Sequence, residues 1–198
     1  MSVLVQSQQS SQWYRITYTP HKMDELRELQ NERLRLFRGV KHPGTNCLQY
    51  TPEIRSFIHK QKIHSLLDFG CGEGLQYDKD FANLIGLPRV DIDLYDIGSK
   101  KNFKLPNHVY DGVIAIDVFQ YIPEALFERE FNELYHRTRN IFAVVNCQPS
   151  DENSVTHRNP QWWDDVFTSF KQYTEVIYYG KGKNENTKRI YHGGSRIG

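Results

Sequence analysis

The chain has 198 residues, a formal net charge of +1 and three cysteines, which suits one domain and argues against a basic field that attracts nucleic acid. No apolar run approaches the roughly 20 residues that cross a bilayer, and no secretory signal opens the chain, so we expect a cytoplasmic protein without a membrane partner. Cysteines without a CxxC pair, and histidines without HxxxH or HExxH spacing, argue against a disulfide framework and against a metal site.

An N-terminal extension precedes the core in the predicted organisation. Residues 1–12 are rich in Ser and Gln and predict a flexible arm. Two helices are expected within 20–60. The first covers 21–38, where apolar residues recur near helical spacing, and the second begins with Pro52 at its first position. Between them, the composition of HPGTN at 42–46 predicts a loop.

From residue 64 to the end, apolar segments typical of strands alternate with segments typical of helices. The last two strands, 174–180 and 188–194, are joined by a short polar connection and predict a hairpin. The alternation predicts one α/β domain, a Rossmann-like doubly wound sheet over 64–198 with a C-terminal antiparallel hairpin and the N-terminal helical extension. The other predicted strands are 65–70, 90–98, 111–119 and 141–147, and the predicted helices are 73–84, 125–139 and 159–170.

The stretch LLDFGCGEG, at 66–74, places glycines at every second position directly after a predicted strand. Ligands of doubly wound sheets bind at the carboxyl ends of the strands, and glycines let the backbone approach a ligand closely. A helix beginning after this loop would attract negative charge at its N-terminus. Asp96 ends the second strand, where it can accept two hydrogen bonds from ribose hydroxyls, and Asp117 ends the third. Together with Asp68, three carboxylates are expected near one cleft.

The loop differs from nucleotide-binding motifs that bind a diphosphate. Leu75 stands where the dinucleotide fingerprint GxGxxG needs glycine, and no GK[ST] follows as in a P-loop. Asp68 and Glu73 also make the loop acidic. An acidic, glycine-lined pocket suits a cofactor with a positive centre, an amine and a ribose, and S-adenosylmethionine has all three.

Three stretches resemble motifs of the class I S-adenosylmethionine-dependent methyltransferases. LLDFGCGEG resembles the first motif, DxGxGxG, and LYDIG resembles the second-strand motif, whose acid holds the ribose. DGVIAIDVFQYIPE resembles the family stretch that commonly reads DGVxxxDVLEHIPE. The match covers about 65–147. The later HRNPQWW is similar to a small group of such enzymes found in phages and bacteria.

The resemblance implies S-adenosylmethionine as the cofactor and assigns three parts of the cleft to it. The glycine loop would contact the methionine end, the end of the second strand would take the ribose beside the adenine, and the end of the third would line the adenine or methionine side. In that order the residues are Asp68, Gly70, Cys71 and Gly72; Asp96 and Ile97; and Asp117 and Val118. Cys71 is interpreted as a small packing residue within the loop.

Two side chains are candidates for the chemistry. His157 follows the predicted strand at 141–147, in a loop expected to border the cleft, where an imidazole could act as a general base. A surface or capping histidine is the alternative. Tyr121 is expected to border the cofactor pocket. Relatives often carry Glu-His where this chain has Gln120-Tyr121, which removes two titratable groups and leaves catalysis open.

The expected function is methyl transfer from S-adenosylmethionine to O or N of a small molecule or glycan. DVFQ stands where DNA amino methyltransferases usually show [DN]PP[YF], which disfavours amino methylation of DNA bases. Basic residues around the last hairpin keep a phosphate-contacting edge open as an alternative to a solvated loop. A catalytically silent S-adenosylmethionine-binding or regulatory protein is the alternative function. A nicotinamide oxidoreductase, the third hypothesis, predicts that NAD raises the melting temperature.

Overall fold

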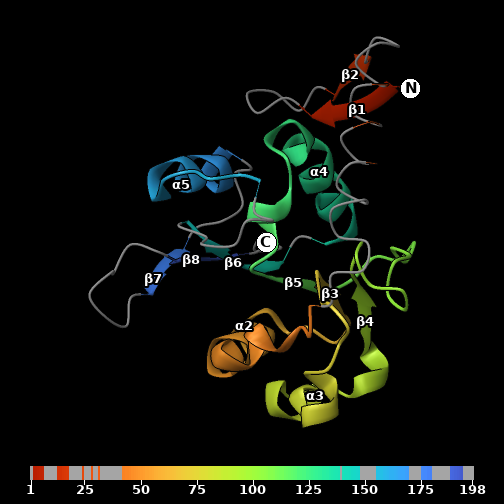
Figure 1. Cartoon of the computed structure of the whole chain (residues 1–198), viewed down its shortest axis with the longest axis vertical. Helices are drawn as coiled ribbons and strands as arrows, with labels where there is room; N and C mark the ends of the chain where they lie inside the picture. The colour runs from red at the N-terminus through yellow and green to blue at the C-terminus, as the bar shows by residue number, and fades with distance from the viewer. Residues whose placement is uncertain are drawn as a thin grey trace.

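The structure of the chain is a computed structural model. It describes residues 2–6, 13–17, 24, 28, 31, 42–138, 140–147, 155–169, 175–179 and 188–193. Their main feature is a six-stranded sheet with the strand order β4-β3-β5-β6-β8-β7 (Figure 1). Its strands are β3 (Leu66–Phe69), β4 (Ile92–Tyr95), β5 (Gly112–Ile116), β6 (Ile141–Asn146), β7 (Glu175–Tyr179) and β8 (Lys188–Gly193). The helices are α2 (Thr51–Gln61), α3 (Phe81–Ile85), α4 (Phe127–Arg137) and α5 (Pro160–Ser169).

Strand order places a switch point at β3. The chain passes from β3 to β4 on one side and then crosses to β5 on the other, and all three strands are parallel. β6 continues the parallel sheet beside β5, whereas β8 is antiparallel to both β6 and β7. The predicted doubly wound sheet and its C-terminal antiparallel hairpin are therefore confirmed. Ligands of such sheets bind at the carboxyl ends of the strands beside the switch point.

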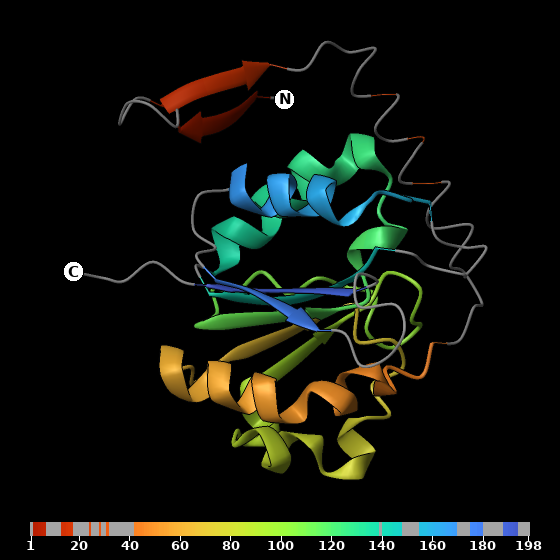
Figure 2. The same ribbon diagram turned by 90° about the vertical axis from the view of Figure 1, so that its left-hand side faces the viewer.

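Helices cover both faces of the sheet, α2 and α3 on one side and α4 and α5 on the other (Figure 2). A strand of this sheet can supply both layers because successive side chains point to opposite faces. Val113 and Ala115 of β5 join the core under α4 and α5, and Ile114 and Ile116 join the core over α2 and α3. This two-sided burial explains why the sequence of β5 is a continuous apolar run.

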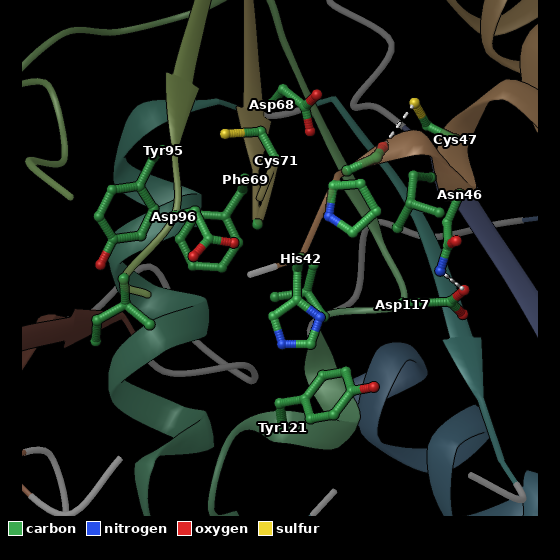
Figure 3. Close-up of a pocket in the computed structure, with 16 residues that line it drawn as sticks. His42, Asn46, Cys47, Asp68, Phe69, Cys71, Tyr95, Asp96, Asp117 and Tyr121 are labelled. Atoms are coloured by element: carbon green, nitrogen blue, oxygen red, sulfur yellow. Dashed lines mark hydrogen bonds between the residues drawn. The ribbon is translucent and has the colours of Figure 1, made fainter. Parts of the chain in front are cut away.

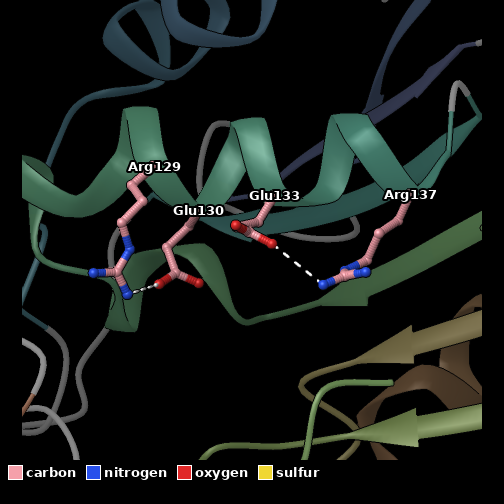
Figure 4. Close-up of polar contacts among 4 residues, drawn as sticks. All are labelled: Arg129, Glu130, Glu133 and Arg137. Carbon is pink, nitrogen blue, oxygen red and sulfur yellow. Dashed lines mark hydrogen bonds and ion pairs between the residues drawn. The ribbon is translucent and has the colours of Figure 1, made fainter. Parts of the chain in front are cut away.

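Helix α4 carries charged pairs (Figure 4). Arg137 contacts Glu133 at 3.2 Å across one helical turn, and Arg129 contacts Glu130 at 3.5 Å. One partner of each pair, Glu133 or Arg129, remains exposed or partly exposed to water, so we expect these pairs to contribute little, about 0–1 kcal/mol. The position of α4 is instead fixed by its buried face, where Phe131 stacks on Phe119 with a centroid distance of 4.8 Å.

Two predicted helices differ from the structure or lie outside it. The helix predicted over 73–84 is broken, because a short 3-10 helix, η2 (Tyr77–Lys79), is followed by Asp80 with φ +63° before α3 begins. No α-helix N-terminus therefore follows the glycine loop directly. The helix predicted over 21–38 lies largely outside the described residues.

The beginning of the chain differs from the predicted arm. β1 (Ser2–Gln6) pairs with β2 (Trp13–Thr17) as an antiparallel two-stranded sheet. The α2 helix, with Pro in its first turn, agrees with the second predicted helix. Among the described residues, no helix combines the length and the apolar character needed to cross a membrane.

Candidate functional site

A pocket opens at the carboxyl ends of β3, β4 and β5, beside the switch point of the sheet (Figure 3). Its wall combines the ends of these strands with residues 42–47, which precede the core in the sequence. The lining residues are His42, Pro43, Gly44, Asn46, Cys47, Asp68, Phe69, Gly70, Cys71, Tyr95, Asp96, Ile97, Ile116, Asp117, Val118 and Tyr121.

The glycine loop after β3 folds back onto the end of β4. The N–H groups of Gly70 and Cys71 donate hydrogen bonds to the carbonyl oxygen of Tyr95, at 2.7 and 3.1 Å. Gly70 has φ +83°, and a Cβ there would lie 2.2 Å from Cγ2 of Val118, so the turn requires glycine. This part of the wall is therefore formed by backbone.

The segment at 42–44 is fastened to the same loop by its backbone. The N–H of Glu73 donates to the carbonyl oxygen of His42 at 2.7 Å, and the N–H of Leu75 donates to that of Pro43 at 3.0 Å. These two bonds fix the segment as a second wall of the pocket.

Gly44 allows this close approach. It has φ +85°, and a Cβ there would lie 2.0 Å from the carbonyl oxygen of Cys71. The sequence analysis missed this wall, because it interpreted HPGTN as an ordinary loop. The glycine was a local signal for a turn, but its partner Cys71 is distant in the sequence, so the contact appears only in the folded chain.

Asp68 is buried at the deep end of the pocket, with 3% of its surface exposed. The side chains of Gln76 and Tyr77 both donate to its Oδ2 oxygen, each at 2.9 Å. Burial raises the pKa of Asp68 to about 6, although these two hydrogen bonds lower it. A positive charge nearby would favour the ionised carboxylate, so this end of the pocket suits a cationic group.

Asp96 shapes the loop that follows β4. Its Oδ1 accepts hydrogen bonds from the N–H groups of Gly98 and Ser99, at 2.7 and 3.1 Å, and its Oδ2 accepts one from Gly72 at 3.0 Å. A carboxylate offers about four lone-pair sites, so these bonds leave roughly one for a ligand instead of the two expected from the sequence. Gly72 does not line the pocket but holds the carboxylate that does.

Asp117 and Tyr121 follow the end of β5. Asp117 has φ +55°, in the left-handed region that non-glycine residues rarely adopt, and its Oδ2 accepts a hydrogen bond from Nδ2 of Asn46 at 3.2 Å. Tyr121 closes a 3-10 helix, η4 (Phe119–Tyr121), and both side chains line the pocket. Backbone strain of this kind is concentrated at functional sites.

His157 is exposed and does not line this pocket. Its loop borders η4. The N–H groups of Val155 and Thr156 donate to the carbonyl oxygen of Gln120 at 3.1 and 3.0 Å, and the Thr156 hydroxyl donates to that of Ile122 at 2.7 Å. The loop therefore supports the segment after β5 without bringing the imidazole into the cavity wall.

The rest of HRNPQWW has structural contacts. Oδ1 of Asn159 accepts the N–H of Trp162 at 2.9 Å and caps α5. Arg158 pairs with Glu124 and lies over the ring of Trp162, 5.5 Å from its centroid. Trp163 is fully buried in the core. The motif therefore positions α5 and its preceding loop.

The electrostatic character of the pocket is acidic. Its described lining residues include the carboxylates of Asp68, Asp96 and Asp117 and contain no lysine or arginine. Burial raises the pKa of both the Cys47 and Cys71 thiols, so they stay protonated at neutral pH, which fits packing better than nucleophilic chemistry. Among the described residues, no group of three or more His, Cys, Asp or Glu side chains is placed to hold a metal ion.

The fold resembles those of several solved methyltransferases. N-methyltransferase NodS from Bradyrhizobium japonicum has a TM-score of 0.52 at 9% identity, with 74% of this chain and 96% of that chain covered. Plantazolicin methyltransferase BpumL, solved in complex with a triazolic desmethylPZN analog and SAH, has a TM-score of 0.51 at 14% identity, with 87% of this chain and 99% of that chain covered. Human N-acetylserotonin methyltransferase in complex with SAM has a TM-score of 0.50 at 12% identity, covering 90% and 61%. At these identities the likeness establishes the fold.

Comparisons of sequence do not identify a family for this chain. No family model matches the chain. A leucine–tRNA ligase of Mesorhizobium japonicum is 31% identical over 98 residues, or 48% of this chain, and one of Rhizobium leguminosarum bv. trifolii is 26% identical over 123 residues, or 62%. The matches span only 10% and 14% of the lengths of those ligases.

Proposed function

We propose that the protein binds S-adenosylmethionine in this pocket and transfers its methyl group to O or N of a small molecule or glycan. The observation that carries the proposal is the acidic pocket at the switch point, on a fold shared with methyltransferases. S-adenosylmethionine has a sulfonium and an ammonium, which match carboxylates, and a ribose, which matches Asp96. A diphosphate cofactor would instead be repelled by these carboxylates.

The residues present fit the parts of this cofactor. Asp68 and the backbone at Gly70 and Cys71 would hold the methionine end, and Asp96 would hold the ribose. The apolar side chains of Ile97 and Val118 would line the adenine. The cofactor supplies a methyl group activated by positive sulfur, and the protein's residues orient the acceptor and exclude water.

The walls at 42–47 and 117–121 would receive the acceptor. They combine hydrogen-bonding side chains, Asn46, Asp117 and Tyr121, with no cationic group among the described lining residues. That composition suits a neutral or positively charged acceptor better than a phosphate-rich one, which supports a small molecule or glycan over nucleic acid.

Binding calorimetry tests the cofactor proposal. We expect S-adenosylmethionine and S-adenosylhomocysteine to bind the wild-type protein, and Asp96→Ala to weaken binding at least about tenfold, since a hydrogen bond to a charged group contributes about 1.5–3 kcal/mol. The matched control is Asp165→Ala, which removes an exposed carboxylate on α5. Absence of binding by either compound would refute the proposal.

A catalytically silent binding or regulatory protein is the second candidate. It is favoured by Gln120, which is buried and whose carbonyl oxygen holds the loop at 155–156, so this position contributes to packing where relatives often carry a titratable residue. Methyl transfer from labelled S-adenosylmethionine to a cell extract separates the two. Tight cofactor binding without any labelled product would favour the silent protein.

A further inference from the structure

His42 is the histidine that folding places in the pocket wall. Its carbonyl oxygen accepts the N–H of Glu73 at 2.7 Å, and a Cβ on Gly72 would lie 2.3 Å from that same oxygen. The backbone of His42 is thus packed tightly against the glycine loop. Its imidazole therefore has a defined position relative to the part of the pocket proposed for the methionine end.

The imidazole lies between the two sides of the pocket. In Figure 3 the ring occupies the middle of the labelled residues, with Asp96 on one side and Asp117 on the other. The Tyr121 ring is its aromatic neighbour, with a centroid distance of 6.0 Å and an interplanar angle of 50°. In S-adenosylmethionine, the sulfur joins the ribose to the methionine chain. Asp96 is proposed to hold the ribose, and Asp117 lies on the wall proposed for the acceptor. A group between them is therefore well placed to face the sulfur and its methyl group.

On the basis of the proposed function, we propose that His42 faces the transferable methyl group and takes the proton of the methyl acceptor. A lone pair on the acceptor O or N forms the bond to the methyl carbon. The carbon–sulfur bond breaks and leaves its electron pair on sulfur, which becomes a neutral thioether. The acceptor proton passes to the unprotonated ring nitrogen of the imidazole, which acts as a general base.

A test of His42 must distinguish the effect of its protonation from the effects of the other titratable groups in the pocket. Asp68 is the main one, because burial places its pKa at about 6. Its charge acts on every ligand that carries the methionine ammonium, whereas the sulfonium charge distinguishes the methyl donor from its product. The titratable side chains lining the pocket with His42 are Asp68, Asp96, Asp117, Cys47, Cys71 and Tyr121.

The experiment compares the affinities of S-adenosylmethionine and S-adenosylhomocysteine by calorimetry at pH 8 and pH 6. A protonated imidazole beside the sulfonium would repel the methyl donor, S-adenosylmethionine. It would not repel the sulfur of the product, S-adenosylhomocysteine, because that thioether carries no charge. In the wild-type protein, we expect the product-to-donor affinity ratio to rise at least about threefold on acidification. His42→Gln should abolish this rise, and His157→Gln should retain it. His42→Asn provides a second variant of His42 if the first does not fold.

Two results would overturn the assignment of His42. One is a wild-type affinity ratio that does not change with pH, and the other is a change that survives in a folded His42 variant. A change lost in His157→Gln but kept in the His42 variants would assign the imidazole to His157. Failure of both compounds to bind at either pH would instead refute the proposed function.

Discussion

At the scale of single residues, the pocket depends on groups placed in costly states. Asp68 is ionisable yet almost fully buried, and Asp117 adopts a left-handed backbone conformation. Each state lowers stability unless something compensates. A cationic ligand would compensate for Asp68, because its charge would favour the ionised carboxylate. These residues are therefore the ones whose replacement should separate stability from binding.

Replacement of Asp68 by Asn should make stability depend less on pH. The pKa of Asp68 is raised from 3.8 to about 6 on folding, so wild-type stability falls as the pH rises through that interval. A shift of this size corresponds to about 3 kcal/mol. Relative to wild type, Asp68→Asn should therefore gain roughly 1–3 kcal/mol between pH 4.5 and pH 7.5, measured by urea unfolding.

Asp165→Asn is the control for this comparison, because its carboxylate is exposed. It should show no comparable gain. An identical stability difference between Asp68→Asn and wild type at both pH values would show that burial does not perturb Asp68. Asp68→Asn should also bind S-adenosylhomocysteine more weakly than the wild-type protein, because the ammonium of the ligand loses its carboxylate partner.

At the scale of elements, the important contact joins the N-terminal segment to the glycine loop. The segment continues into a 3-10 helix, η1 (Thr45–Tyr50), and its residues Cys47 and Tyr50 are buried in the core beside α2. Loop and segment therefore form one unit, with a hydrophobic anchor behind it. Loss of the close approach at Gly44 should disturb both walls of the pocket.

Gly44→Ala tests this unit against a matched glycine. Gly44 and Gly86 have φ of +85° and +86°, but an added Cβ meets the Cys71 carbonyl oxygen at Gly44 and nothing within 4 Å at Gly86. Both variants should lose about 1 kcal/mol for the backbone conformation. Gly44→Ala should lose roughly 1–3 kcal/mol more from overpacking, measured by urea unfolding.

Cofactor affinity supplies a second measurement on the same pair. Gly44→Ala should weaken S-adenosylhomocysteine binding at least about tenfold, the equivalent of 1.4 kcal/mol, because the wall carrying His42 must move. Gly86→Ala should leave affinity nearly unchanged. Equal effects of both variants would contradict the proposed docking of the segment on the loop.

At the scale of the whole molecule, two hydrophobic cores share the same strands. β6 sends Ala143 and Val145 to one core and Phe142 and Val144 to the other. Neither core can lose its packing without exposing strands that support the other. Unfolding is therefore expected to be a single transition, and a ligand held at the strand ends should stabilise the whole domain.

Saturating S-adenosylhomocysteine should raise the melting temperature in one transition. At a concentration of 100 times its dissociation constant, a ligand adds about 2.7 kcal/mol of stability. For a chain of this size that corresponds to a shift of roughly 5–10 °C, measured by differential scanning calorimetry. NAD should produce no shift, and an equal shift with NAD would support the oxidoreductase hypothesis instead.

The sequence alone determined the α/β class, the succession of the core strands along the chain and the ends of those strands as the place of the pocket. These features follow from periodicity and from local rules, because a buried parallel strand must be apolar and a tight turn must contain glycine. These rules predicted the glycine loop and the carboxylates of Asp68, Asp96 and Asp117. The structure places all three carboxylates in the pocket wall together with Gly70 and Cys71, whereas Gly72 lies outside the wall and holds Asp96.

Tertiary structure alone decided which histidine and which other groups complete the wall. His42 and Gly44 reach the pocket through contacts with Glu73 and Cys71, which lie far away in the sequence. His157, predicted for the chemistry, lies outside this wall because its loop is fastened to η4 by backbone hydrogen bonds. Spacing along the chain cannot reveal such contacts, because they depend on how separate elements pack together.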